Sequence, residues 1–226
     1  KWFGSRTSPE NLTRAIKVYN ETRRLFRNLY DLRAGPHPPV TGAEAMTLAA
    51  ASTLMPKEAF NPLLSRILEE TGQRSIETDH QPRLVIAGSL LDDPGFVENV
   101  ESLGSVVVSD ALCFGARSVW YLTDERMDPF DALCRRYYEH EPCPRMAGEY
   151  DRRMDFLKNQ IERSRADGAV LEYIKFCDQH GTDNALLRQS LKKEKIPVIE
   201  LERQYGPLAD TGRIRTRVQA FLERIG

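Results

Sequence analysis

The chain has 226 residues and a formal net charge of -1, because 32 Lys and Arg residues nearly balance 33 Asp and Glu residues. This balance gives no sign of the basic surface that nucleic-acid or anionic-membrane binding requires. No apolar run reaches the roughly 18 to 20 residues of a membrane span, and no secretory signal pattern is present. We therefore expect a cytoplasmic globular protein that binds neither nucleic acid nor membrane.

The cysteines stand at positions 113, 134, 143 and 177, and no two of them form a CxxC pair. Their spacing excludes a self-contained zinc ribbon or bacterial ferredoxin motif. In a reducing cytoplasm, free thiols or metal ligands are favoured over disulfides. The start, "KWFGS", has no initiator Met, which we interpret as the interior of a longer chain or a processed chain.

Residues 1–80 predict a helical segment. Ser8 is a suitable N-cap before Pro9, and "LTRAIKVYNETRRLFRNLYDLR" repeats its apolar residues at helical spacing. The break "AGPHPPVTG" ends this long helix, and "AEAMTLAAAST" and "NPLLSRILEETG" predict two shorter helices. The basic cluster "ETRRLFRN" is interpreted as the water-facing side of the first helix.

Residues 81–226 predict a flavodoxin-like α/β domain. The runs "RLVIAGS", "SVVVSD", "GAVLEYI" and "IPVIELE" are apolar and β-branched, as in parallel strands that are covered on both faces. Helical patterns separate them, and "GRIRTRVQAFLERIG" predicts a last helix packed on the sheet. We expect an open sheet of about four strands with helices on both faces.

Ligands of open parallel sheets bind beyond the carboxyl ends of the strands. Here these ends carry "GSLLDD", "SDALCFGAR", "KFCDQHGTDN" and "ERQYGPL", so Cys113 and Cys177 are candidate functional thiols. Packing in the protein interior is the alternative for Cys113, and solvent exposure in a polar loop is the alternative to a ligand or base role for His180. No phosphate-loop motif is present. Candidates for phosphate contacts are Arg117, Arg203, Arg213, Arg215 and Arg217, of which Arg203 is the best placed.

Five stretches in order resemble one family: "YNETRRLFRNLYDLR", "GSLLDDPGFVENVESLGSVVVSDALCFGAR", "DGAVLEYIKFCDQHG", "IPVIELERQYG" and "GRIRTRVQAFLERIG". Together they look like the carboxyl-terminal portion of the 2-hydroxyacyl-CoA dehydratase and benzoyl-CoA reductase family, of the 2-hydroxyglutaryl-CoA dehydratase D-component type. The resemblance covers nearly the whole chain.

The resemblance implies a radical enzyme of anaerobic metabolism that carries an iron–sulfur cluster, commonly [4Fe-4S]. Such an enzyme pairs two related subunits and receives a low-potential electron from an ATP-hydrolysing iron–sulfur activator. The electron enters an acyl-CoA, either to expel a hydroxyl group as a lyase or to reduce an aromatic ring as an oxidoreductase. The residues leave these two reactions open.

The family's strand-end cysteine corresponds to Cys177, which the resemblance implies is a cluster ligand. Lys175, Phe176 and Asp178 would surround the cluster, and Asp183 or Asn184 could cap the helix that follows. The amino-terminal end of this helix would favour the thiolate form that a cluster needs.

The family's amino-terminal domain, with the other cluster cysteines, has no counterpart here. We therefore expect a fragment that is inactive alone, with Cys113 a weaker candidate for a second ligand and Arg203 a candidate contact for CoA. The alternative is a non-catalytic flavodoxin-like module for subunit pairing or CoA binding.

Overall fold

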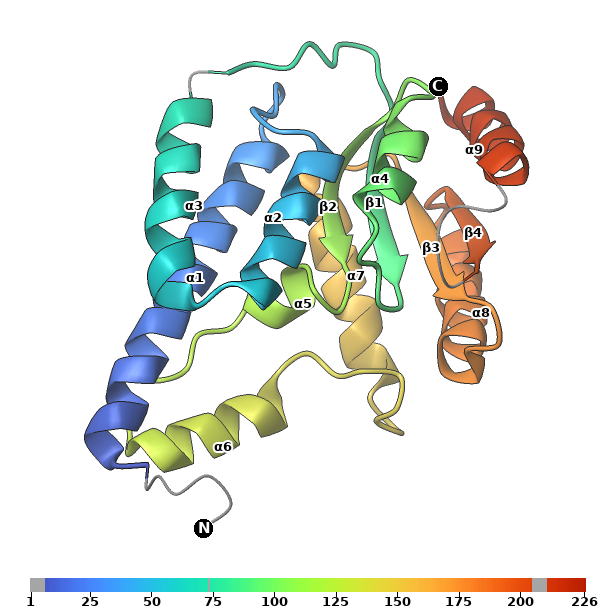
Figure 1. Ribbon diagram of the computed structural model, residues 1–226. Coiled ribbons are helices and arrows are strands. Elements are labelled where there is room, and N and C mark those ends of the chain that lie inside the picture. Colours follow the sequence, from blue (N-terminus) through green and yellow to red (C-terminus); the bar gives the residue numbers. More distant parts are fainter. Residues whose placement is uncertain (1–6, 73, 205–210) are drawn as a thin grey trace.

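The computed structural model describes residues 7–72, 74–204 and 211–226, and in them helices cover both faces of a parallel sheet (Figure 1). The strands are β1 (Arg83–Gly88), β2 (Val106–Ala111), β3 (Gly168–Ile174) and β4 (Val198–Arg203). The helices of these residues are α1 (Pro9–Ala34), α2 (Gly42–Leu54), α3 (Lys57–Thr71), α4 (Pro94–Glu101), α5 (Ala116–Val119), α6 (Pro129–Glu139), α7 (Tyr150–Ser164), α8 (Asp178–Lys193) and α9 (Thr211–Ile225). The predicted α/β fold class is confirmed.

The four strands are parallel and lie in the order β2-β1-β3-β4. This is the order of the first four strands in flavodoxin-like folds. From β1 the chain moves outward to β2 and then crosses back to β3, so the topological switch point lies between β1 and β3. The carboxyl ends of the strands face the side of the molecule on which α6 lies, below the sheet in Figure 1.

Alternate side chains of β1 enter the two halves of the core, as the two-residue period of a strand requires. Val85 and Ala87 contact the cluster that includes residues of α1, α7 and α8. Leu84 and Ile86 contact the cluster built on α4 and α9. Because both faces are buried, the strands appear in the sequence as continuous apolar runs.

The predicted helical segment forms α1, α2 and α3, which pack onto this core. Ser8 caps α1 by accepting a hydrogen bond from the N–H of Asn11 at 3.3 Å. Thr41 and Glu44 form a reciprocal capping box at the start of α2. Phe26 of α1 and Phe60 of α3 stack with ring centroids 5.9 Å apart and lie in the same core cluster as Val85. The leading helices therefore share a core with the sheet.

The predicted start of the helix after β3 was wrong. Neither Asp183 nor Asn184 is its N-cap, because α8 already begins at Asp178 with Cys177 in the N-cap position. Gly181 and the polar letters of "DQHGTDN" suggested a loop, but this stretch forms the first two turns of α8. Cys177 consequently lies directly at the helix end.

The other predicted ends and helices agree with the structure, except that α5 was not predicted. The part of the "ERQYGPL" loop beyond Gln204, like the "KWFGS" start, lies outside the described residues. Among the described helices, none is both long and apolar enough to cross a membrane.

Candidate functional site

The switch point is built on a close approach between the ends of β1 and β3. Gly88 has a φ of 144°, and a Cβ atom at this position would lie 1.9 Å from the carbonyl oxygen of Glu172. Only glycine tolerates this combination. The next residue, Ser89, donates its hydroxyl to the Glu172 carboxylate at 2.8 Å. The glycine therefore allows the two strands to meet where open α/β sheets bind their ligands.

A buried ion pair joins the ends of β3 and β4. Glu172 is 0% and Arg203 is 7% exposed, and the Arg203 Nε donates to the Glu172 carboxylate at 2.9 Å. Burial raises the pKa of Glu172, which the charge of Arg203 opposes. Arg203 also donates to the carbonyl oxygen of Leu90. Its guanidinium thus has partners within the chain, and a CoA contact there stays a prediction.

Cys177 lies between β3 and α8, half-buried, and its side chain makes no capping hydrogen bond. The backbone reverses at Phe176, which has a φ of 68° and is 89% exposed. The Cys177 N–H donates to the carbonyl of Ile174 at 2.9 Å. The Lys175 ammonium lies 5.3 Å from the centroid of the Phe176 ring, and Asp178 is exposed in the first turn of α8. The thiol is therefore held at the positive end of a 16-residue helix.

This position fits one ligand of an iron–sulfur cluster. Such clusters take cysteine thiolates, and a partly exposed thiol at a helix amino terminus is suited to ionise. Within the described residues, no group of three or more His, Cys, Asp or Glu donors includes Cys177. The described part of the chain thus offers Cys177 alone at this point, and further ligands would have to come from elsewhere.

Cys113 follows β2 and lines a different feature, a groove of about 450 Å³ between α1, α2, α3, α5 and α6. Burial raises the pKa of the Cys113 thiol, while Arg117, whose Nη1 lies 3.8 Å from its Sγ, opposes the shift. A raised pKa works against the thiolate that a metal ligand must supply. Cys143, in the loop after α6, lines the same groove. A ligand role for Cys113 stays a prediction.

His180 lies in α8 and is buried, not exposed in a loop. Together with Glu141 and Arg117 it lines a cavity of about 30 Å³ at the ends of β1 and β2. Burial, with a smaller contribution from Arg117, lowers the pKa of His180 to about 4. Burial raises the pKa of Glu141 to about 7 against the opposing charges of Arg152, Arg117 and Arg153. At neutral pH, His180 is neutral and Glu141 is about half protonated.

Sequence reasoning missed the basic residues of the groove, Arg23, Lys57 and Arg136. The interpretation of "ETRRLFRN" as water-facing holds for Arg24 and Arg27, which are exposed, but is wrong for Arg23, which is half-buried. Arg23 follows Tyr19 by four residues and precedes Phe26 by three, so it shares their face of α1. That spacing was the signal that could have placed it.

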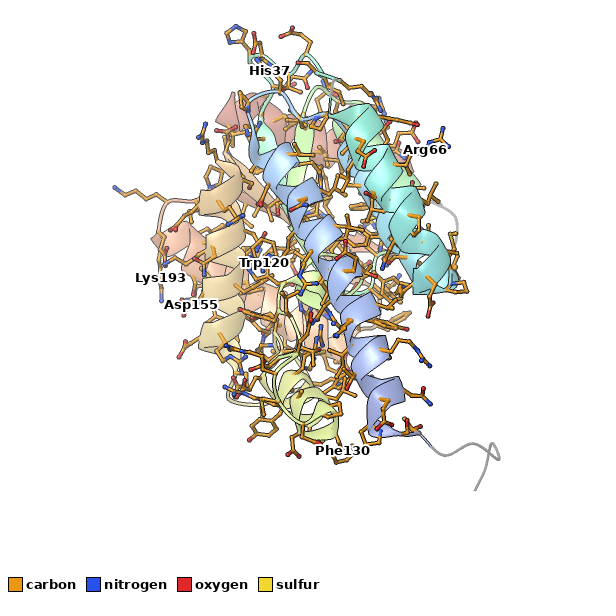
Figure 2. All side chains as sticks on the ribbon, turned by 90° about the vertical axis from the view of Figure 1, so that its left-hand side faces the viewer. His37, Arg66, Trp120, Phe130, Asp155 and Lys193 are labelled. Carbon is orange, nitrogen blue, oxygen red and sulfur yellow. The ribbon has the colours of Figure 1, made fainter. Side chains whose placement is uncertain are left out.

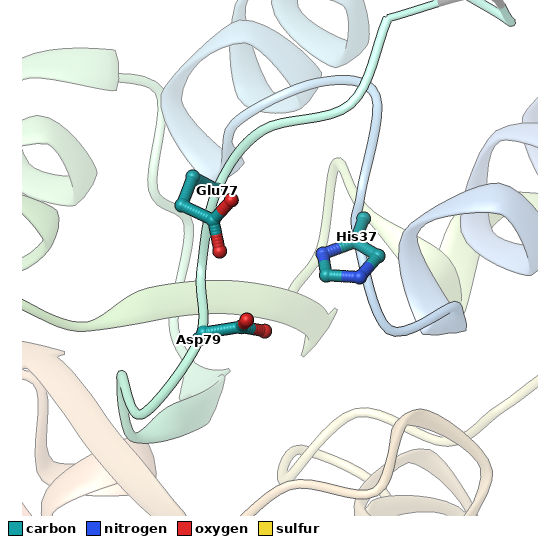
Figure 3. A group of neighbouring side chains, drawn as sticks. All are labelled: His37, Glu77 and Asp79. Carbon is teal, nitrogen blue, oxygen red and sulfur yellow. The ribbon is translucent and has the colours of Figure 1, made fainter.

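His37, Glu77 and Asp79 form a separate group whose donor atoms lie within 4.8 Å of one another (Figure 3). All three side chains are exposed. They lie in the loops after α1 and before β1, at the end of the molecule opposite Phe130 of α6 (Figure 2). This group is therefore remote from the carboxyl ends of the strands and from Cys177.

The described residues thus define an open, doubly wound α/β domain whose ligand-binding edge carries a partly exposed cysteine at a helix amino terminus. Residues 1–225 match the model of the family described as "2-hydroxyglutaryl-CoA dehydratase, D-component". The chain belongs to this family, and the resemblance found in the sequence is confirmed.

Curated relatives include dehydratase and reductase subunits. The chain is 28% identical to "Putative dehydratase subunit YjiM" of Escherichia coli (strain K12), in an alignment covering 99% of the chain and 59% of the relative. It is 22% identical to the (R)-phenyllactyl-CoA dehydratase beta subunit of Clostridium sporogenes, over 100% of the chain and 60% of the relative. It is 25% identical to a benzoyl-CoA reductase subunit of Thauera aromatica, over 88% and 53%. The chain therefore spans less than two thirds of the length of these relatives.

Proposed function

We propose that this chain is part of an iron–sulfur subunit that delivers a low-potential electron to an acyl-CoA, in an enzyme of the 2-hydroxyacyl-CoA dehydratase or benzoyl-CoA reductase type. The observation that carries the proposal is the position of Cys177, a partly exposed thiol at the N-cap of α8 beside the switch point. The family match over residues 1–225 and the relatives' names support the same function.

A [4Fe-4S] cluster, when bound, would supply the one-electron chemistry. Cys177 would hold one iron as a thiolate, and the free N–H groups in the first turn of α8 would be available to hydrogen-bond to sulfide. Lys175 would add positive charge beside the site. Gly88 and the Glu172–Arg203 pair fix the end of β3 and therefore the place of Cys177.

The remaining ligands, a homologous sister subunit and an ATP-hydrolysing activator complete the proposed assembly. The relatives' names include both a dehydratase and a reductase, so both reactions are candidates. In a dehydratase the electron would be returned after the hydroxyl group leaves the acyl-CoA. In a reductase it would be consumed by the aromatic ring.

The test is anaerobic turnover by a polypeptide that carries this chain extended to the length of its relatives, with the sister subunit, the activator and ATP. We expect conversion of a 2-hydroxyacyl-CoA or of benzoyl-CoA, detected as the enoyl-CoA or the dienoyl-CoA by mass spectrometry. Cys177→Ser should reduce turnover to background. Cys134→Ser, which changes an exposed thiol on α6, is the matched control and should retain it. Binding of both acyl-CoAs without turnover would support the non-catalytic alternative.

A further inference from the structure

The groove lined by Cys113 concentrates positive charge on one side of the ligand-binding edge. Its cations come from separate elements: Arg23 from α1, Lys57 from α3, Arg117 from α5 and Arg136 from α6. Glu141 is the acidic residue among its lining residues. Because burial raises the pKa of Glu141 to about 7, its carboxyl carries only part of a negative charge at neutral pH.

In the described part of the chain, none of these four cations forms an ion pair with a carboxylate. Arg23 donates to the Asn20 side chain at 2.8 Å, and Arg136 donates to the carbonyl oxygen of Ser118 at 2.8 Å. Arg117 donates to the carbonyl oxygen of Pro142 at 3.2 Å. All of these acceptors are neutral.

Aromatic rings, not carboxylates, stand beside three of the cations. Arg23 and Lys57 lie 5.9 and 5.6 Å from the centroid of the Tyr19 ring, and Arg136 lies 5.7 Å from that of Tyr137. Contacts of this kind contribute only about 0.5–1 kcal/mol at exposed sites. They do not compensate for withdrawing several positive charges from water.

The crowding of like charge is visible in the protonation of these groups. Burial and the charge of Arg136 lower the pKa of Arg23 to about 10. Burial and the charge of Arg23 lower the pKa of Lys57. In addition, the Nε atoms of Arg117 and Arg136 are buried without a hydrogen-bond partner in the described residues. A set of cations held together in this way is completed by an anion from outside the chain.

We propose that this groove binds the nucleoside diphosphate portion of an acyl-CoA, with Arg23, Lys57 and Arg136 contacting its phosphates. The inference rests on the proposed function, which makes an acyl-CoA the substrate. Guanidinium and ammonium groups are the side chains that recognise phosphate. Tyr19 and Tyr137 are 50% and 66% exposed, so their rings are accessible to an adenine base. A volume of about 450 Å³ is within the range of small-molecule sites.

The test is isothermal titration of the 226-residue chain with CoA, ADP and pantetheine. In the described part of the chain Lys57 donates no hydrogen bond, so Lys57→Gln removes the charge with little effect on folding; Arg136→Gln is the second variant. Each should weaken CoA and ADP binding about tenfold, since a lost charged hydrogen bond costs about 1.4 kcal/mol or more. Pantetheine, which lacks the nucleotide, should bind neither wild type nor variants measurably.

The matched controls are Lys193→Gln on α8 and Arg66→Gln on α3, two exposed cations outside the groove, and both should bind CoA as the wild type does. Thermal unfolding checks that each variant is folded. Equal CoA affinity in wild type, Lys57→Gln and Arg136→Gln would overturn the inference, as would pantetheine binding as tightly as CoA.

The inference and the proposed function fail separately. Weakened CoA binding in both groove variants, with no iron bound at Cys177, would support the groove and contradict the electron-carrying function. Turnover of an acyl-CoA by a protein whose groove variants bind CoA normally would support the function and contradict the groove.

Discussion

Glu172 and Arg203 illustrate how single residues fix the ligand-binding edge. Removing one partner of a buried pair leaves an uncompensated charge, at a typical cost of about 3–5 kcal/mol. We therefore expect Arg203→Met to lower the free energy of unfolding by about this amount, measured by urea denaturation at pH 7. Arg66→Met, which breaks the exposed pair with Glu70, should cost less than about 1 kcal/mol. Equal losses in the two variants would contradict a structural role for the buried pair.

Glu141 and His180 make opposite contributions to the pH dependence of stability. The pKa of Glu141 is about 7 in the folded protein, above its ordinary value of 4.5, so the folded state holds a proton that the unfolded chain has released. Stability from this group falls as pH rises from about 4.5 to 7. The pKa of His180 is about 4, below its ordinary value of 6.5, so the unfolded chain binds the extra proton. Stability from His180 rises as pH increases from about 4 to 6.5.

Glu141→Gln should therefore gain stability relative to wild type as pH is raised from 5 to 7.5. His180→Asn should show the reverse trend, with its stability relative to wild type decreasing over the same range. The measurement is urea unfolding of the three proteins at several pH values. Because each substitution also changes packing, the slope with pH is compared and not the absolute stability. Parallel pH profiles for Glu141→Gln and wild type would show that the burial of Glu141 does not shift its titration.

At the scale of elements, the contact between β1 and β3 depends on Gly88. Gly88→Ala would place a Cβ atom 1.9 Å from a backbone oxygen, so the two strands must separate. We expect a loss of about 3 kcal/mol or more in the free energy of unfolding. Gly104→Ala is the matched control, because Gly104 also has a positive φ, 89°, but a Cβ atom added there would have no neighbour within 4 Å. It should cost about 1 kcal/mol from backbone strain alone. Similar unfolding curves for the two variants would contradict this account of the switch point.

The elements were predictable where local pattern and burial agree. The strands of the sheet are apolar on both faces, so their runs in the sequence located them within two residues at either end. The start of α8 was mispredicted because Gly181 and its polar neighbours favour a loop locally, whereas packing on β3 and the Arg153–Asp183 ion pair at 2.6 Å support a helix. Cys177 was found because strand ends are readable from sequence. The groove was not found, because it joins side chains of α1, α3, α5 and α6 that only the tertiary fold brings together.

At the scale of the whole molecule, the chemically distinctive groups lie at the carboxyl ends of the strands. Cys177 lies after β3, Arg203 ends β4, and the cationic groove begins after β2 at Cys113. The near-zero net charge of the chain therefore conceals a local excess of positive charge on this side. In the proposed assembly, this edge would hold the cluster and the acyl-CoA.

The most direct measurement is iron and acid-labile sulfide per chain after anaerobic reconstitution of the protein extended to the length of its relatives. Wild type, Cys177→Ser, Cys113→Ser and Cys134→Ser are compared, with electron paramagnetic resonance of the reduced samples. We expect about four iron and four sulfide per cluster in the wild type and in Cys134→Ser, since [4Fe-4S] is the proposed cofactor. Cys177→Ser should lose the iron and the signal, whereas Cys113→Ser reports whether the second thiol takes part. Full iron content and an unchanged signal in Cys177→Ser would contradict its role as a cluster ligand.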